Sequence, residues 1–138
     1  MELKAEILLP GDALAGSCLA LTAPISFWGG VDPASGTIID ARHPERGQNI
    51  AGRILALPGT IGSSSASAVL LELVHAGKAP AALLMDAPDA ILLLGLVVAR
   101  EMGWPTPPAF RLPATDQKAL ADRRIAISAE GLISTDRG

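Results

Sequence analysis

The sequence predicts a mixed α/β domain with a barrel-like or sandwiched central sheet and a few covering helices. Hydrophobic residues make up 49% of its 138 residues, which is enough for a core and argues against disorder. Short strand-like segments separated by turns fill the first half of the chain. The second half alternates between strand and helix patterns, which is typical of helices packed against a sheet.

The expected strands of the first half are short and bounded by Gly, Pro and polar residues. Residues 3–8 alternate between apolar and polar types, as a half-buried strand does. Further strands are expected over residues 16–21, 37–40 and 50–57. Residues 24–33 are too rich in Gly and Pro for a regular element, so we expect a structured loop there.

Helix signals appear in the second half. We expect one helix from Ser64 or Ser65 to about His75, and another from the cap Asp89 through Met102. A glycine shortly after each segment supplies the stop. The remaining expected elements are a buried strand over 81–85, a strand near Phe110, a short helix beginning at Thr115 or Asp116, and a hairpin of 124–128 with 132–135.

Composition and charge exclude several functional classes. A net charge of -3 with no basic cluster argues against nucleic-acid binding. Cys18 is the only cysteine, so no internal disulfide can form, and one thiol cannot build a zinc or iron–sulfur site. The N-terminus lacks a secretory signal, and the longest apolar run, 90–99, is too short to span a bilayer. We therefore expect a cytoplasmic single domain over residues 1–138, with no metal ligands of its own and no membrane partner.

The most informative motif is a glycine-rich turn that runs into clustered serines, Gly59-Thr60-Ile61-Gly62-Ser63-Ser64-Ser65-Ala66-Ser67. The serines stand where a helix should begin, and a helix N-terminus has unpaired N–H groups and partial positive charge. The simplest interpretation is a helix cap with spare hydroxyls. Alternatively, successive hydroxyls and N–H groups form a cup for a carboxylate or a phosphate. The motif matches neither a Walker A loop nor a nucleophile elbow.

A second motif lies in the Gly- and Pro-rich loop of the first half. Phe27 and Trp28 are two of only four aromatic residues other than histidine, and they are adjacent. Either they fill the core, or the loop forms one wall of a ligand site. In that case Gly29 and Gly30 would let a ligand approach the backbone, and Asp32 would orient a donor group.

The two histidines differ in context. His43 lies in a polar loop with charged neighbours, where a solvated loop is the simplest interpretation. A Ser–His–Asp arrangement could be drawn from Ser63, His43 and either Asp32 or Asp40, but no spacing supports it. His75 falls near the end of the first expected helix, where a protonated imidazole is favoured, so we expect a structural role.

Together these segments resemble the small subunit of the aconitase X family. The run Ser26-Phe27-Trp28-Gly29-Gly30-Val31-Asp32-Pro33 is highly specific, and the serine motif is less so. The resemblance covers nearly the whole chain. It implies a swivelling β/β/α domain that works with a larger subunit, which holds an iron–sulfur cluster through cysteines. Family members are hydro-lyases: some bacterial ones dehydrate cis-3-hydroxy-L-proline, and archaeal ones dehydrate mevalonate 5-phosphate.

The resemblance also implies roles for individual residues. Ser63, which follows Gly62, would be the base that takes a proton from the carbon beside the substrate carboxylate. Ser64 and Ser65 would hold that carboxylate and the charge that develops on it. The other expected substrate contacts are Phe27, Trp28, Gly29, Gly30, Asp32 and His43. A chain that works with a partner should also expose an apolar face around the serines and the loop that carries Trp28.

One departure from the family pattern bears on the substrate. Many relatives are expected to have an arginine just before the Gly-Ser step, where this chain has Ile61. A serine alkoxide needs a stabilising cation, which the partner would then have to supply. The missing cation also disfavours a phosphorylated substrate, so the sequence favours hydroxyproline over mevalonate 5-phosphate. A non-catalytic binding or interaction domain is the alternative from another class.

Overall fold

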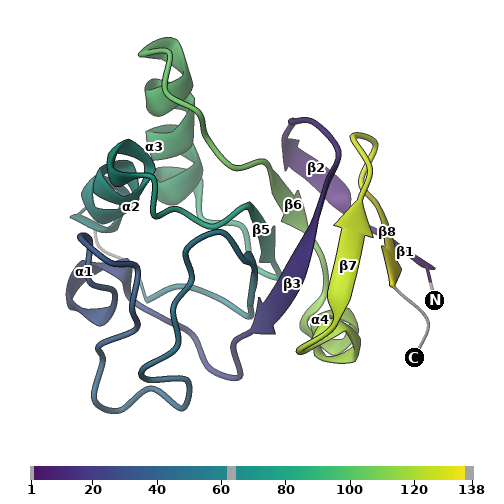
Figure 1. Cartoon of the computed structure of the whole chain (residues 1–138), viewed down its shortest axis with the longest axis horizontal. Coiled ribbons are helices and arrows are strands. Elements are labelled where there is room, and N and C mark those ends of the chain that lie inside the picture. Colours follow the sequence, from purple (N-terminus) through teal and green to yellow (C-terminus); the bar gives the residue numbers. More distant parts are fainter. Residues whose placement is uncertain (1, 62–64, 136–138) are drawn as a thin grey trace.

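The structure, a computed structural model, describes residues 2–61 and 65–135 and combines one sheet with helices (Figure 1). The strands in this part of the chain are β1 (Glu2–Lys4), β2 (Glu6–Leu9), β3 (Leu14–Ala20), β4 (Ile54–Leu57), β5 (Ala82–Met85), β6 (Ala109–Arg111), β7 (Arg124–Ile127) and β8 (Leu132–Thr135). The helices are α1 (Phe27–Gly30), α2 (Ser65–Ala76), α3 (Ala90–Glu101) and α4 (Ala114–Leu120). The predicted mixed α/β class is confirmed.

The strands form an eight-stranded sheet in the order β1-β8-β7-β3-β4-β5-β6-β2. The central strands β3, β4, β5 and β6 run parallel, and the outer pairs are antiparallel. The two edge strands, β1 and β2, are consecutive in sequence and separated by Ala5 alone, whose N–H donates to the Gly131 carbonyl at 2.9 Å. The sheet therefore curls until its edges meet, which gives the barrel-like shape that the sequence predicts.

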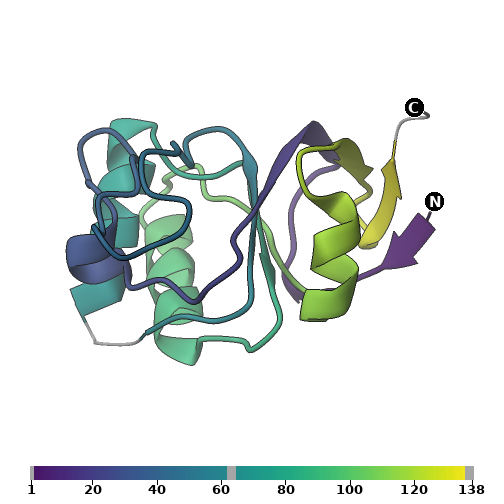
Figure 2. The ribbon, with the colours of Figure 1, turned by 90° about the horizontal axis from the view of Figure 1, so that it is seen from below.

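The two central strands β4 and β5 are buried on both faces, which explains their continuous apolar runs. Alternate residues of each strand belong to two separate core clusters. Leu55, Leu57 and Leu83 face the side on which α2 and α3 pack, whereas Ile54 and Leu84 face the barrel interior. Figure 2 shows α2 and α3 together on one side of these strands and α4 on the other.

The two long helices begin and end near the predicted residues. The Asp89 carboxylate accepts hydrogen bonds from the N–H groups of Ile91 and Leu92, as an N-cap should. Gly77 (φ 72°) and Gly103 (φ 79°) adopt the left-handed conformation that ends each helix.

Three predicted strands need correction. Residues 37–40 form only isolated bridges, Val31 with Ile38 and Thr37 with Asn49. The strand predicted over 50–57 starts at Ile54, because Gly52 has φ 70° and cannot continue an extended strand. The strand predicted over 3–8 is divided into β1 and β2, because the chain passes between the two sheet edges there.

Candidate active site

The structure brings the loop that carries Trp28 and the residues before the serines together, beyond the C-terminal ends of β3 and β4. Ser63 and Ser64 lie outside the described residues, and Ser65 is the first residue of α2. Ile25 pairs with Thr60 in a parallel bridge: the Ile25 N–H donates to Gly59 O at 3.3 Å, and the Ile61 N–H donates to Ile25 O at 2.9 Å. The loop that carries Trp28 is therefore fixed beside the segment that leads into the serines.

A second anchor ties this segment to α3. The Thr60 hydroxyl donates to Asp89 Oδ2 at 2.7 Å, while Oδ1 of the same carboxylate caps α3. The sequence predicts only the capping role of Asp89. The contact with Thr60 joins residues 29 positions apart, and no local pattern indicates it.

Of the two adjacent aromatic residues, one fills the core and the other is exposed, as the wall of a ligand site would be. Phe27 is fully buried in the core, whereas the Trp28 side chain is 61% exposed. α1 is a distorted turn rather than a regular helix, because Trp28 has an extended ψ of 114° and Gly29 has φ 77°. Gly29 is exposed with no atom within 4 Å of an added Cβ, while Gly30 is buried and packs near Ile25. Trp28 and Gly29 are thus the parts of this loop that can face a ligand.

The side chains of Asp32 and His43 both form hydrogen bonds that stabilise loops. The Asp32 carboxylate accepts hydrogen bonds from the Ala34 N–H at 3.0 Å and the Ser35 hydroxyl at 2.9 Å, which closes the turn after it. His43 Nε2 donates to Ala23 O, and Nδ1 accepts from the Glu45 N–H, each at 3.1 Å.

The loop that carries His43 is solvated, as expected, because most of residues 41–49 are exposed, but the His43 side chain itself is only 6% exposed. The side chain is drawn inward because two backbone groups pair with its ring. Both ring nitrogens are occupied, which leaves neither to accept a proton from a serine in a Ser–His–Asp arrangement. Direct contact of His43 or Asp32 with substrate stays a prediction.

Two exposed apolar side chains lie on the paired segments: Ile61, where the resemblance leads us to expect an arginine, is 59% exposed, and Trp28, three residues after Ile25, is 61% exposed. An apolar face around the serines stays a prediction. Residues 2–135 match the family model described as the aconitase X swivel domain. This chain belongs to the aconitase X swivel-domain family.

Relatives of this swivel domain occur as parts of longer chains and as separate small chains. A cis-3-hydroxy-L-proline dehydratase of Pseudomonas aeruginosa is 50% identical over 102 residues, which cover 71% of this chain but 18% of that protein. A phosphomevalonate dehydratase small subunit of Thermococcus onnurineus is 39% identical over 99 residues, which cover 72% of this chain and 75% of that subunit. The chain thus spans under a fifth of the Pseudomonas protein that it resembles.

The fold of this swivel domain has a close match among solved structures. The crystal structure of Thermococcus kodakaraensis aconitase X in its holo form superposes with a TM-score of 0.85 and 29% identity, covering 99% of both chains. Within the described ranges, no helix has the length and apolar character needed to cross a membrane.

The described residues of this swivel domain do not fit an iron–sulfur cluster. Among residues 2–61 and 65–135, no group of three or more His, Cys, Asp or Glu side chains could hold a metal ion. Cys18 is fully buried, and burial raises the pKa of its thiol to about 11, although Arg53 opposes that effect. A buried neutral thiol is a poor metal ligand, since metals bind the thiolate.

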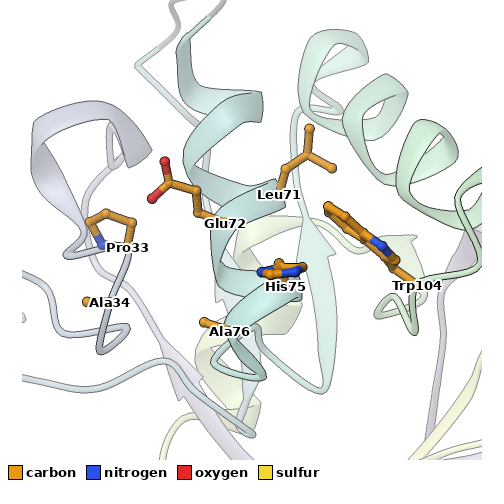
Figure 3. Close-up of a pocket in the computed structure, with 7 residues that line it drawn as sticks. All are labelled: Pro33, Ala34, Leu71, Glu72, His75, Ala76 and Trp104. Atoms are coloured by element: carbon orange, nitrogen blue, oxygen red, sulfur yellow. The ribbon is translucent and has the colours of Figure 1, made fainter.

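A groove of about 460 Å³ lies over the C-terminal half of α2, away from Ser65 (Figure 3). Its lining residues are Pro33, Ala34, Leu71, Glu72, His75, Ala76 and Trp104. The rings of His75 and Trp104 pack with centroids 4.9 Å apart, on the side of α2 away from Pro33. None of the predicted substrate contacts lines this groove, and no motif in the sequence points to Trp104.

Proposed function

We propose that this swivel domain is the small subunit of a hydro-lyase that dehydrates cis-3-hydroxy-L-proline. The observation that carries the proposal is the pairing of Ile25 with Thr60, which fixes the loop of the exposed Trp28 beside residues 59–61, the residues that precede the serine motif in sequence. The 50% identity to the Pseudomonas aeruginosa cis-3-hydroxy-L-proline dehydratase supports this choice of substrate. We propose that the whole chain, residues 1–138, is one domain that acts with a larger subunit.

Ser63 is the proposed base, which takes a proton from the carbon beside the substrate carboxylate. It lies two positions before the first residue of α2, and the start of a helix carries partial positive charge. This field favours a serine oxygen that has lost its proton and an anionic substrate group. Ser64 and Ser65 are proposed to hold the carboxylate as charge develops on it.

Trp28 and Gly29 are proposed as the opposite wall, since both are exposed at the turn of α1. Asp32 and His43 support this wall through the turns that their side chains close. A cation for the serine is proposed to come from the larger subunit, because Ile61 stands where an arginine was expected. The iron–sulfur cluster is likewise proposed to belong to the larger subunit.

Dehydration of mevalonate 5-phosphate is the second candidate. The 39% identity to the phosphomevalonate dehydratase small subunit of Thermococcus onnurineus favours it. A phosphate group is recognised best by cationic side chains, and residues 59–61 provide none. A non-catalytic interaction domain is the remaining alternative, which a chain that binds no larger subunit would favour.

The test is to co-express the chain with the larger subunit from the same organism and to measure water loss from both substrates. We expect turnover of cis-3-hydroxy-L-proline and little or none of mevalonate 5-phosphate. In Ser63→Ala, kcat should fall by about 10²–10⁴-fold, as for loss of a general base. The control is Ser17→Ala, an exposed serine on β3, which should leave kcat unchanged. Full activity in Ser63→Ala would remove Ser63 as the base.

A further inference from the structure

The outer side of α3 carries a group of apolar side chains that no other described part of the chain covers. Each is between 42% and 62% exposed. They are Ile91, Leu94, Val97, Val98 and Met102, and we call them the α3 face. A surface helix normally presents polar residues on its outer side, so this face is unusual for a domain that stands alone.

The helix spacing separates this face from the packed side of α3. Ile91, Leu94 and Val98 follow one another at intervals of three and four residues, which places them on one side. The opposite side packs against α2, and Gly95 approaches it so closely that an added Cβ would lie 3.0 Å from Ser67 Cβ. The α3 face therefore cannot pack against this domain, because the opposite side of α3 already contacts α2.

The α3 face begins next to the candidate site. Asp89, the cap of α3, holds Thr60 through its carboxylate. Two exposed apolar side chains flank this tie: Ile61 follows Thr60, and Trp28 lies on the loop that pairs with Thr60 through Ile25. A molecule that covers Thr60 and Ile61 would therefore lie next to the start of α3. The strands β1 and β8 lie on the far side of the molecule from α3 (Figure 1).

We propose that the α3 face, together with Trp28 and Ile61, is the surface on which the larger dehydratase subunit docks through a complementary apolar surface. This inference rests on the proposed function. A second copy of this chain pairing through α3 alone fits less well: 12 residues of helix extend about 18 Å, too short for the roughly 800 Å² per partner of a stable interface. A larger subunit can cover the helix and the edge of the site together.

The proposal is tested with the full chain and the larger subunit, using Leu94→Arg and Val98→Arg. Both side chains are exposed, so the variants should fold, and circular dichroism and thermal melting check this. Each charge should raise the Kd for the larger subunit by at least about tenfold, because an arginine would be buried against apolar groups. The matched control is Leu132→Arg on β8, which is 42% exposed and should change Kd by less than about twofold.

Unchanged affinity in folded Leu94→Arg and Val98→Arg overturns the proposal. The proposal is also overturned if the wild-type chain binds no larger subunit. It is likewise overturned if the wild-type chain self-associates through α3 and both variants still bind the larger subunit with the wild-type Kd. Activity separates this proposal from the proposed function. A wild-type complex that forms through the α3 face but dehydrates neither substrate contradicts the function alone.

Discussion

Cys18 lies in β3 with its thiol fully buried among the apolar side chains inside the barrel. Burial raises the pKa of this thiol from an ordinary value of 9.0 to about 11. Between these values the unfolded chain releases the thiol proton while the folded protein keeps it. The free energy of unfolding should therefore fall by about 1–3 kcal/mol as the pH rises from about 9 to about 11.

Urea unfolding of the wild type and of Cys18→Ala at several pH values measures this effect. The difference in unfolding free energy between the two proteins should be constant below about pH 9 and should shrink above it. A difference that stays constant up to pH 11 would contradict the prediction.

A single carboxylate, Asp89, also joins two elements of the candidate site. Thr60→Val removes the hydroxyl that donates a hydrogen bond to Asp89 Oδ2 at 2.7 Å, but it leaves the cap of α3 in place. We expect kcat of the complex with the larger subunit to fall about 10–100-fold, because the segment before the serines loses a fixed position. The unfolding free energy should change by only about 1 kcal/mol.

Steady-state kinetics and urea unfolding of Thr60→Val separate these two effects. Thr115→Val, on the exposed surface of α4, is the control and should change neither quantity. Equal kcat in both variants would show that the tie to Asp89 does not position the site.

At the scale of elements, a buried amide helps to attach α4 to the sheet, beside the buried side chain of Leu120. Gln117 is 3% exposed, and its Nε2 donates to the carbonyls of Leu57, Leu84 and Leu112 at 3.1, 3.4 and 2.9 Å. Gln117→Met keeps a similar side-chain length but removes the donor. Loss of these hydrogen bonds should cost about 1–3 kcal/mol of stability, measured by urea unfolding.

The matched change is Lys118→Met, on the next residue of α4, whose side chain is exposed. It should alter the unfolding free energy by no more than about 0.5 kcal/mol. If both variants lost the same stability, the amide would not be what attaches α4 to the sheet.

At the scale of the whole molecule, the barrel closes where Ala5 passes the turn at Gly131. Gly131 has φ 90°, and an added Cβ would lie 2.5 Å from Ala5 O. Gly131→Ala should therefore cost about 3 kcal/mol or more, through backbone strain and through displacement of the edge strands. Thermal or urea unfolding measures this cost.

Gly77→Ala measures the cost of backbone strain alone, without displacement of the edge strands. Gly77 has φ 72°, but no atom lies within 4 Å of its added Cβ, so only the left-handed conformation is penalised, by about 1–2 kcal/mol. Equal losses in the two variants would mean that the contact between Gly131 and Ala5 does not limit barrel closure.

The features that the sequence predicts well depend on residues close together in the chain. The cap at Asp89, the stops at Gly77 and Gly103, and the terminal hairpin follow from local backbone preferences, and the buried strands follow from short apolar runs. The family was also evident in the sequence, because its specific motif, residues 26–33, is a continuous segment. The proposed base at Ser63 stays a prediction that rests on this resemblance.

The sequence alone therefore determined the class of fold, the three longer helices α2, α3 and α4, and the family. Only the tertiary structure decided that Phe27 points inward and Trp28 outward, that His43 is buried, and that Thr60 lies between Ile25 and Asp89. The physical reason is the range of the interactions. Caps and turns form within a few residues, whereas burial and the pairing of distant segments depend on how the whole sheet closes and on which of its faces the helices cover.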